Sequence, residues 1–276
     1  MSAAPQVAVT GTFDDPRSRS LRFLQEAARL GEVTVLLWSD EAAGQLEGPP
    51  PKFPLAERAY FLRALRYVKQ VLPVAGAVDA GSLPSAPGYN PDVWVVQASE
   101  AAAGQQAFCR SRGLSYRVLA ASQLNGFPSF QKSPGPAGVS RKKVVVTGSF
   151  DWFHSGHIRF FEEASALGDL YVVVGHDANI RLLKGAGHPL FPQEERLFFV
   201  QSIRFVTDAL ISTGQGWLDA DPEIQRLKPD IYAVNQDGDK GDKDQYCRQH
   251  GIQYVVLKRT PAPGLPRRSS TELRGF

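Results

Sequence analysis

The chain has 276 residues, 43% of them hydrophobic and 10% aromatic, and a formal net charge of +3. Its length suits two domains of ordinary size, and this composition can build hydrophobic cores. The small net charge argues against a dedicated nucleic-acid-binding protein but allows small anionic ligands. The sequence shows neither a signal peptide nor an apolar run of membrane-spanning length, so we expect a cytoplasmic protein with no membrane span and no nucleic-acid partner.

An internal duplication organises the chain. Shifting the sequence by 137 residues aligns residues 7–40 with residues 144–177 and gives 15 identities in 34 positions. After one inserted residue the shift becomes 138, and the match continues through Cys109 and Cys247. A long period that is present twice indicates duplicated domains rather than a solenoid. Because the two cysteines occupy equivalent positions in the two copies, we expect them to be buried in separate cores and not to form a disulfide.

Each copy alternates strand and helix patterns, which calls for a parallel sheet covered by helices on both faces. The predicted fold class is therefore α/β, with two tandem doubly wound domains of Rossmann-like form. In the second copy, strands are expected at residues 143–146, 170–174, 209–212, 231–234 and 253–257, and helices at residues 158–167, 193–202 and 245–250. A Pro- and Gly-rich linker, residues 131–142, separates the first domain, residues 1–130, from the second, residues 143–276.

The most informative motif follows the first strand of the second copy. The strand pattern ends near Gly148, which permits a tight exit, and helical spacing begins at Ile158. His154 and His157 lie where the helix begins, and the free N–H groups and positive dipole end there attract anions. Gly156 lets a ligand approach the backbone between them. The pattern predicts a phosphate site, whereas zinc is disfavoured because a third ligand at typical spacing is missing.

These residues resemble a family signature. The run Gly148-Ser149-Phe150-Asp151, followed by His154-Ser155-Gly156-His157, resembles the GxFDxxHxGH signature of the cytidylyltransferase-like nucleotidyltransferases. The resemblance implies catalytic roles for His154, His157 and Lys184. It implies substrate contacts for Trp152 and Asp177, and nucleotide contacts for Gly148, Ser149, Phe150, Asp151, Gly156, Arg196, Asp237, Arg259, Arg268, Ser269, Ser270 and Thr271. No side chain is expected to ligate a metal, and magnesium is expected to accompany the nucleoside triphosphate.

Three of these assignments carry alternatives. Because Glu195-Arg196 recurs as Glu57-Arg58 in the first copy, Arg196 either holds the fold together or contacts the nucleotide. Residues 261–268 separate the two halves of the family's tail motif, which leaves open whether Arg259 or Arg268 takes the phosphate. The turn at residues 234–239 departs from the family's V-x-G-x-D pattern, which contacts the base, so the identity of the base is open as well.

The first copy lacks the groups that would handle phosphate. It has Arg17-Ser18-Arg19-Ser20 where the second copy has the two histidines, and Glu47 where the second copy has Lys184. The basic, hydroxyl-rich tail has no counterpart there. We therefore expect the first copy to be a catalytically inactive scaffold. The alternative is that Arg17 and Arg19 bind a different anion.

The resemblance implies nucleotidyl transfer, which relies on positioning and charge stabilisation rather than on a covalent nucleophile. Since the tandem layout most resembles the ethanolamine-phosphate enzymes, we expect transfer of CMP from CTP to a small phosphorylated alcohol or sugar, with release of pyrophosphate. The alternatives are an adenylyltransferase of the same fold that uses ATP, and a non-catalytic nucleotide sensor. The resemblance also implies an intramolecular pseudo-twofold dimer of the two copies. Further homo-oligomerisation and the identity of the phosphorylated substrate are left open.

Overall fold

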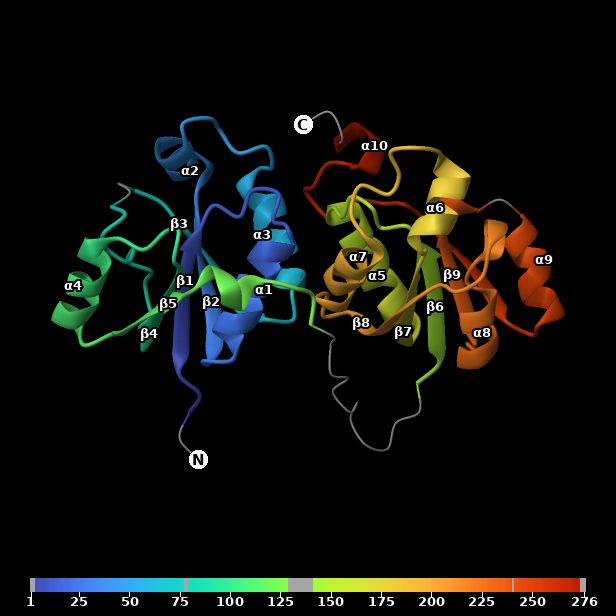
Figure 1. Ribbon diagram of the computed structural model, residues 1–276, viewed down its shortest axis with the longest axis horizontal. Coiled ribbons are helices and arrows are strands. Elements are labelled where there is room, and N and C mark those ends of the chain that lie inside the picture. Colours follow the sequence, from blue (N-terminus) through green and yellow to red (C-terminus); the bar gives the residue numbers. More distant parts are fainter. Residues whose placement is uncertain (1–2, 77–78, 129–140, 240, 274–276) are drawn as a thin grey trace. The chain divides into compact units, whose positions relative to one another are not determined.

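The computed structural model describes residues 3–76, 79–128, 141–239 and 241–273. The chain divides into two compact units, Met1–Phe127 and Pro128–Phe276, which we call the first and second units (Figure 1). Residues 131–140 of the expected linker lie outside the described residues. Each unit is described by itself, and the expected pseudo-twofold pairing of the two stays a prediction.

The second unit is a doubly wound parallel sheet. Its strands are β6 (Lys143–Gly148), β7 (Asp169–Val174), β8 (Val206–Ile211), β9 (Ile231–Asn235) and β10 (Gln253–Leu257), in the order β10-β9-β6-β7-β8. Its helices are α5 (Ser155–Leu167), α6 (Asp177–Lys184), α7 (Gln193–Gln201), α8 (Asp221–Leu227), α9 (Asp242–Gln249) and α10 (Ser270–Leu273). The five strands and three helices expected from the sequence are confirmed, whereas α6, α8 and α10 were not among those expected.

The first unit repeats this sheet. Its strands are β1 (Gln6–Gly11), β2 (Glu32–Trp38), β3 (Val68–Val74), β4 (Val93–Gln97) and β5 (Ser115–Leu119), all parallel, in the order β3-β2-β1-β4-β5. Its helices are α1 (Ser18–Ala28), α2 (Asp40–Glu47), α3 (Leu55–Ala64) and α4 (Ala103–Arg112). In both units the strand order reverses between the first and fourth strands, where doubly wound sheets place their ligands at the carboxyl ends. The α/β fold with two tandem parallel-sheet domains is therefore confirmed.

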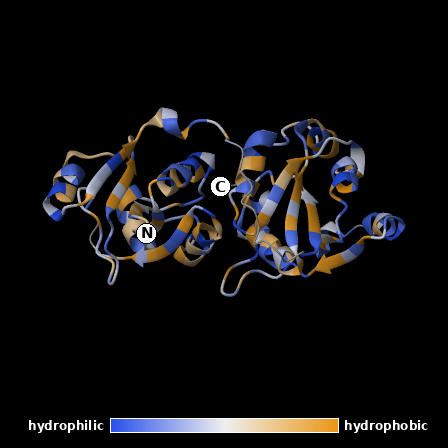
Figure 2. Cartoon of the chain, turned by 90° about the horizontal axis from the view of Figure 1, so that it is seen from below, coloured by the Kyte–Doolittle hydropathy of each residue, from blue (hydrophilic) through white to orange (hydrophobic). Residues whose placement is uncertain are grey.

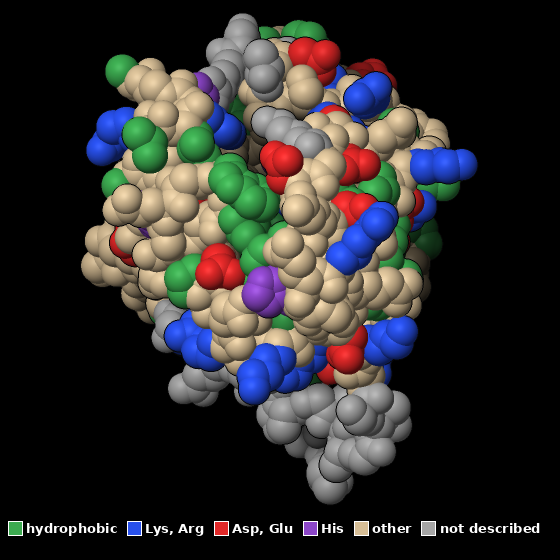
Figure 3. Space-filling model, turned by 90° about the vertical axis from the view of Figure 1, so that its right-hand side faces the viewer, with side chains coloured by type: hydrophobic (Ala, Val, Ile, Leu, Met, Phe, Trp, Pro, Cys, Tyr) green, Lys and Arg blue, Asp and Glu red, His purple; other side chains and the backbone are tan. Residues whose placement is uncertain are grey.

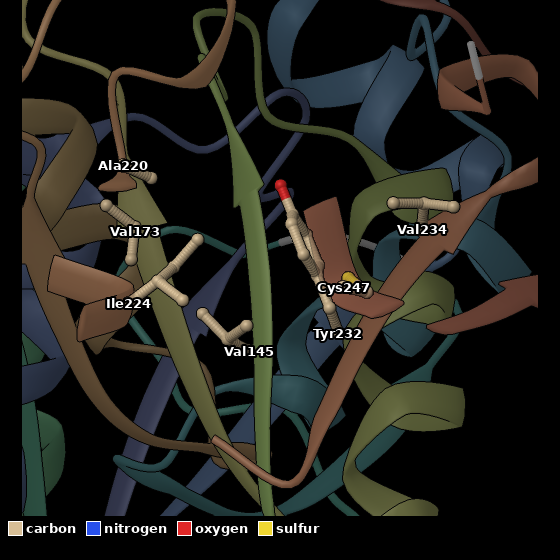
Figure 4. Close-up of a cluster of buried hydrophobic side chains, with 7 residues drawn as sticks. All are labelled: Val145, Val173, Ala220, Ile224, Tyr232, Val234 and Cys247. Carbon is tan, nitrogen blue, oxygen red and sulfur yellow. The ribbon is translucent and has the colours of Figure 1, made fainter. Parts of the chain in front are cut away.

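A buried cluster ties the second sheet to α8 and α9. It consists of Val145, Val173, Ala220, Ile224, Tyr232, Val234 and Cys247, each at most 4% exposed (Figure 4). Burying one such aliphatic side chain contributes about 1.5–3 kcal/mol to folding. Both cysteines are free and buried, one in each unit, as the duplication predicts. Burial raises the pKa of the Cys247 thiol to about 11, so it behaves as a small core residue.

The other face of the second sheet packs against α5 and α7. Since strand side chains alternate, the buried residues Val144 and Val146 lie on the face of the sheet opposite to Val145. Phe153, just before α5, joins the two helices: its ring centroid lies 5.7 Å from that of Phe161 in α5 and 5.6 Å from that of Phe199 in α7. Figure 2 shows the result in each unit, with largely hydrophobic strands between helices of mixed hydropathy. This packing fixes where α5 begins relative to the end of β6.

The described surface carries charges of both signs. Figure 3 shows Lys and Arg side chains interspersed with Asp and Glu on one face, with apolar side chains between them. No helix in the described parts of the chain is long and apolar enough to cross a membrane.

Candidate active site

The loop from β6 to α5 begins with a close contact between Gly148 and Phe150. Phe150 has a φ of 48°, a left-handed conformation that is uncommon outside glycine. Its ring lies over Gly148, where an added Cβ atom would approach the ring to 2.9 Å. The same ring is edge-on to His157, with centroids 5.4 Å apart. Phe150 is buried, so its visible role is to support His157, and glycine at position 148 makes room for it.

His154 caps the N-terminus of α5. Its Nδ1 accepts a hydrogen bond from the backbone N–H of Gly156 at 3.1 Å, so the ring proton is on Nε2. Nε2 is buried and has no hydrogen-bond partner among the described residues. An added Cβ atom at Gly156 would lie 2.9 Å from the imidazole, so this glycine accommodates the ring. His154 therefore keeps one N–H donor ready for a ligand.

His157 stacks on His154, with ring centroids 4.0 Å apart and planes inclined by 28°. Its Nδ1 is also buried and without a partner in the described part of the chain. Burial lowers the pKa of His154 to about 3, and the positive charges of Arg259 and Arg268 add to the effect. Burial, followed by His154, Arg259 and Lys184, holds the pKa of His157 well below its usual value. Both imidazoles are therefore neutral near pH 7 and can donate hydrogen bonds without carrying charge.

Lys184 brings a cation to this loop from α6, of which it is the last residue. Its Nζ donates to Ser149 Oγ at 2.7 Å, and its side chain is exposed. Ser149 directly precedes Phe150, so the ammonium group of Lys184 contacts the same loop that supports His157. The structure thus brings together the three residues expected to be catalytic.

The C-terminal tail closes the site from the other side. Arg259 forms an ion pair with Asp237 and donates to the backbone carbonyl of Arg268 at 3.0 Å. That carbonyl passes so close to Gly156 that an added Cβ atom there would lie 3.5 Å from it. Both arginines therefore lie near His154, and each depresses its pKa. The guanidinium of Arg259 is partly used to hold the tail, while Asp237, expected at the base, contacts Arg259.

The tail hydroxyls also contact the loop after β6. Ser270 Oγ donates to the carbonyl of Trp152 at 3.0 Å, and Ser269 Oγ accepts from the backbone N–H of Glu272 at 3.3 Å. The Trp152 ring lies edge-on to Phe191, with centroids 5.9 Å apart. The side chain of Thr271 lies outside the described part of the structure. These contacts join the tail to the loop that carries His154.

Arg196 links several loops through the hydrogen bonds of its guanidinium group, an arrangement that we call a bracket. Its guanidinium donates to the carbonyls of Phe191 (2.9 Å), Ser149 (2.6 Å) and Gly175 (2.8 Å) and to Asp177 Oδ1 (2.7 Å), and the residue is 1% exposed. In the first unit Arg58 makes the same set of contacts, with the carbonyls of Phe53, Thr12 and Trp38 and with Asp40. The geometry favours the structural alternative for Arg196 over a nucleotide contact. Asp177 accepts from the same guanidinium, and the substrate contact expected of Asp177 stays a prediction.

Asp151 holds the segment before α7. Its Oδ1 accepts from the backbone N–H groups of Leu190 at 2.6 Å and Phe191 at 3.2 Å, and it is 3% exposed. Asp14 accepts from Lys52 and Phe53 in the same way in the first unit. The Asp151 carboxylate, whose Oδ2 also lies 3.4 Å from His188 Nδ1, therefore contacts the protein itself, and the nucleotide contact expected of it stays a prediction.

Two features of the site were not found in the sequence. Tyr232 extends along the sheet in Figure 4, and its hydroxyl lies 2.7 Å from Thr147 Oγ1 at the end of β6. His176 caps α6 as His154 caps α5, with Nδ1 accepting from the backbone N–H of Asn179 at 3.2 Å and Nε2 lying 2.8 Å from the carbonyl of Gly214. A sequence signal existed for the first: Tyr232 aligns with an aromatic residue, Trp94, of the other copy.

A doubly wound sheet with neutral imidazoles and cations at the carboxyl end of its central strand is the architecture of a nucleotidyltransferase. Comparison with known proteins agrees: the family model described as cytidylyltransferase-like matches residues 145–275. An FAD synthase from Pyrococcus horikoshii is 39% identical over 126 residues, covering 44% of this chain and 82% of that relative. One from Methanocella paludicola is 33% identical over 135 residues, covering 48% and 93%. The chain therefore belongs to the cytidylyltransferase-like family of nucleotidyltransferases.

Two further proteins are similar to this chain. The FAD synthase of Pyrococcus abyssi is 42% identical over 126 residues and is covered to 82% of its length. The crystal structure of a lipopolysaccharide core biosynthesis protein from Thermoplasma volcanium is 27% identical, with a TM-score of 0.38, over 45% of this chain and 99% of that one. Since FAD contains an adenine nucleotide, the expectation of CMP transfer from CTP to a phosphorylated alcohol or sugar is wrong. The matches do not test the tandem layout.

Proposed function

We propose that the second unit is an adenylyltransferase that transfers AMP from ATP to the phosphate of FMN and releases pyrophosphate. The observation that carries this proposal is the similarity of the chain to archaeal FAD synthases over 82% and 93% of their length. The geometry around His154 and His157 supports the same chemistry. In this proposal the first unit has no part in the chemical step.

The two histidines stabilise the transferred phosphoryl group. The buried Nε2–H of His154 and the N–H of the neutral His157 donate to oxygens of the α-phosphate, where negative charge is redistributed in the transition state. Because both rings stay neutral near pH 7 and each keeps one N–H, their donors are available across neutral pH. Donors placed in this way are each worth about 2.7–4 kcal/mol in the transition state.

The cations act on the leaving pyrophosphate. Lys184 approaches from α6 and Arg268 from the tail, and Arg259 fixes the tail through Asp237 and the Arg268 carbonyl. Ser269 and Ser270 bind the distal phosphates, and the same role for Thr271 rests on the sequence alone. Among the described residues no group of three His, Cys, Asp or Glu side chains is arranged to hold a metal ion. In this proposal magnesium would be held mainly by the triphosphate of the bound ATP. Trp152 contacts the acceptor.

The test is a direct assay of the full chain. Pyrophosphate release is measured with ATP or CTP and magnesium, each with FMN, glycerol 3-phosphate or no acceptor, and products are separated by chromatography. The expected result is FAD formed from ATP and FMN, lost in the His157→Ala variant and kept in the Ser20→Ala variant. Turnover of CTP in place of ATP would overturn the adenylyl assignment. Nucleotide binding without pyrophosphate release would mean a sensor instead.

A further inference from the structure

The first unit contains a cavity of about 460 Å³ at the carboxyl ends of β1 and β4. Thr10, Gly11 and Thr12 line it from the end of β1, and Trp94 and Gln97 line it from β4. This is the point where the strand order reverses, the usual ligand position of a doubly wound sheet. The cavity thus survives in the copy that lost the nucleotidyl-transfer residues, and its size suits a small molecule.

The sign of the charge in this cavity is negative. Its described lining includes Asp14, Glu47, Asp79 and Glu100, and no Lys, Arg or His. Asp14 accepts from backbone N–H groups, Asp79 Oδ1 accepts from the backbone N–H of Gly81 at 2.8 Å, and Glu100 Oε1 accepts from Gln97 Nε2 at 3.0 Å. Glu47, Asp79 and Glu100 are exposed residues. Glu47 is also the last residue of α2, where an acid is unfavourable to the helix dipole, so helix stability does not account for it.

The arginines considered as an anion site do not line the cavity. Arg17 forms an ion pair with Asp15, and Arg19 donates to Gln97 Oε1 at 3.3 Å from outside the lining. A phosphate in the cavity would face carboxylates where the second unit offers Lys184. The geometry therefore disfavours the alternative in which the first copy binds a different anion at this position.

Two buried polar groups in the lining point to a ligand. Thr12 is 5% exposed and Trp94 is 2% exposed, and neither Thr12 Oγ1 nor Trp94 Nε1 has a hydrogen-bond partner among the described residues. A buried donor without a partner costs free energy, and an indole N–H can only donate. A ligand that satisfies Trp94 must therefore carry an acceptor. The aromatic rings of Trp38 and Phe13 in the lining suit a cation beside them.

We propose that the first unit binds a small organic cation, an amine that also carries a hydroxyl or carbonyl oxygen, in this cavity. The ammonium group faces Glu47, Asp79 and Glu100, and the oxygen accepts from Trp94 Nε1 and contacts Thr12 Oγ1. This site does not depend on the reaction of the second unit. The cavity lies at the position of a nucleotide site, but its lining favours a positively charged ligand instead of a negatively charged one.

The test uses the full chain and two sets of probes that share a ring and differ in charge. One set is tyramine, 4-ethylphenol and 4-hydroxyphenylacetate, and the other is glucosamine, glucose and glucuronate, with binding measured by calorimetry and saturation-transfer NMR. The amine of at least one set should bind tenfold or more tightly than its neutral and acidic partners, with a Kd of about 1 mM or below. Equal binding within both sets, or no amine binding at about ten times that concentration, overturns the proposal.

Two variants locate the site. Glu47→Lys should weaken amine binding tenfold or more, whereas Glu41→Lys, an exposed position on the same helix outside the lining, should leave it unchanged. Thr12→Val should weaken binding about threefold without lowering the unfolding temperature, because the hydroxyl has no partner to lose. If Glu47→Lys and Glu41→Lys weaken binding equally, or if Thr12→Val lowers stability and leaves binding unchanged, the cavity is not the site.

Discussion

The two units have the same sheet order but different residues at the carboxyl end of the central strand. The residues that shape the loop are kept: Phe13 and Phe150 share the left-handed conformation, and Arg58 and Arg196 share the bracket. The residues that face the ligand have changed, since Glu47 stands where the second unit has Lys184. In this comparison the residues kept in both units shape the loop, and the residue that differs between the units faces the ligand.

Substituting Arg196 and Arg58, which make the same hydrogen bonds in the two units, tests what the units share and should give the largest effect. Arg196→Ala and Arg58→Ala each leave several buried carbonyls and a carboxylate without partners, so each should destabilise its own unit by about 3–5 kcal/mol. Hydrogen exchange of β6 and β1 measures the two units separately. Arg248→Ala, which removes an exposed helix pair, is the control and should cost less than about 0.5 kcal/mol. A loss confined to activity in Arg196→Ala would assign that arginine to the nucleotide.

The histidines test the catalytic difference between the units. His154→Ala and His157→Ala should each lower kcat by a hundredfold or more, about 2.7 kcal/mol, while the fold is kept. The matched changes Arg17→Ala and Ser20→Ala in the first unit should leave kcat unaltered. Steady-state pyrophosphate release with ATP and FMN measures both. A comparable fall in the first-unit variants would show that the first unit takes part in the reaction.

The pH dependence of stability should also separate the units. A pKa of about 3 for folded His154, against about 6.5 when unfolded, means that the unfolded state binds more protons between these values. Stability of the second unit is therefore complete above about pH 6.5 and falls as the pH drops, by about 2 kcal/mol between pH 7 and pH 5. The first unit has no histidine. Hydrogen exchange should show this fall in β6 of the native chain, reduced in His154→Asn, and little change in β1; equal slopes in native protein and variant would contradict the buried neutral imidazole.

Exchanging the charges at positions 184 and 47 should give the smallest effect. Lys184→Glu places in the second unit the residue found at the equivalent position of the first, and kcat/KM for ATP should fall at least tenfold, about 1.4 kcal/mol. Glu47→Lys, the reverse change, should leave kcat/KM untouched. Kinetics at varied ATP concentration compare the two. If Lys184→Glu acts like Glu47→Lys, the lysine does not contact the nucleotide.

The sequence alone determined the architecture of this protein and the place of its site. Periodicity and the internal duplication predicted two parallel-sheet domains, because strand and helix patterns depend on near neighbours. The signature around His154 and His157 predicted a phosphate site for the same reason. Local sequence also placed His154 and His157 together near the start of an expected helix, whereas the helix that carries Lys184 was not expected.

Only the tertiary structure decided what individual polar residues do. Asp151 and Arg196 fit the family pattern, yet Asp151 contacts the backbone of Leu190 and Arg196 contacts the carbonyls of Ser149 and Gly175, which no local pattern specifies. The neutrality of His154 likewise depends on its burial and on two arginines brought close to it by the C-terminal tail. The negative cavity of the first unit appears only when β1, β4 and α2 are assembled. Burial, hydrogen-bond partners and local charge are set by contacts between distant segments, and these exist only in the folded chain.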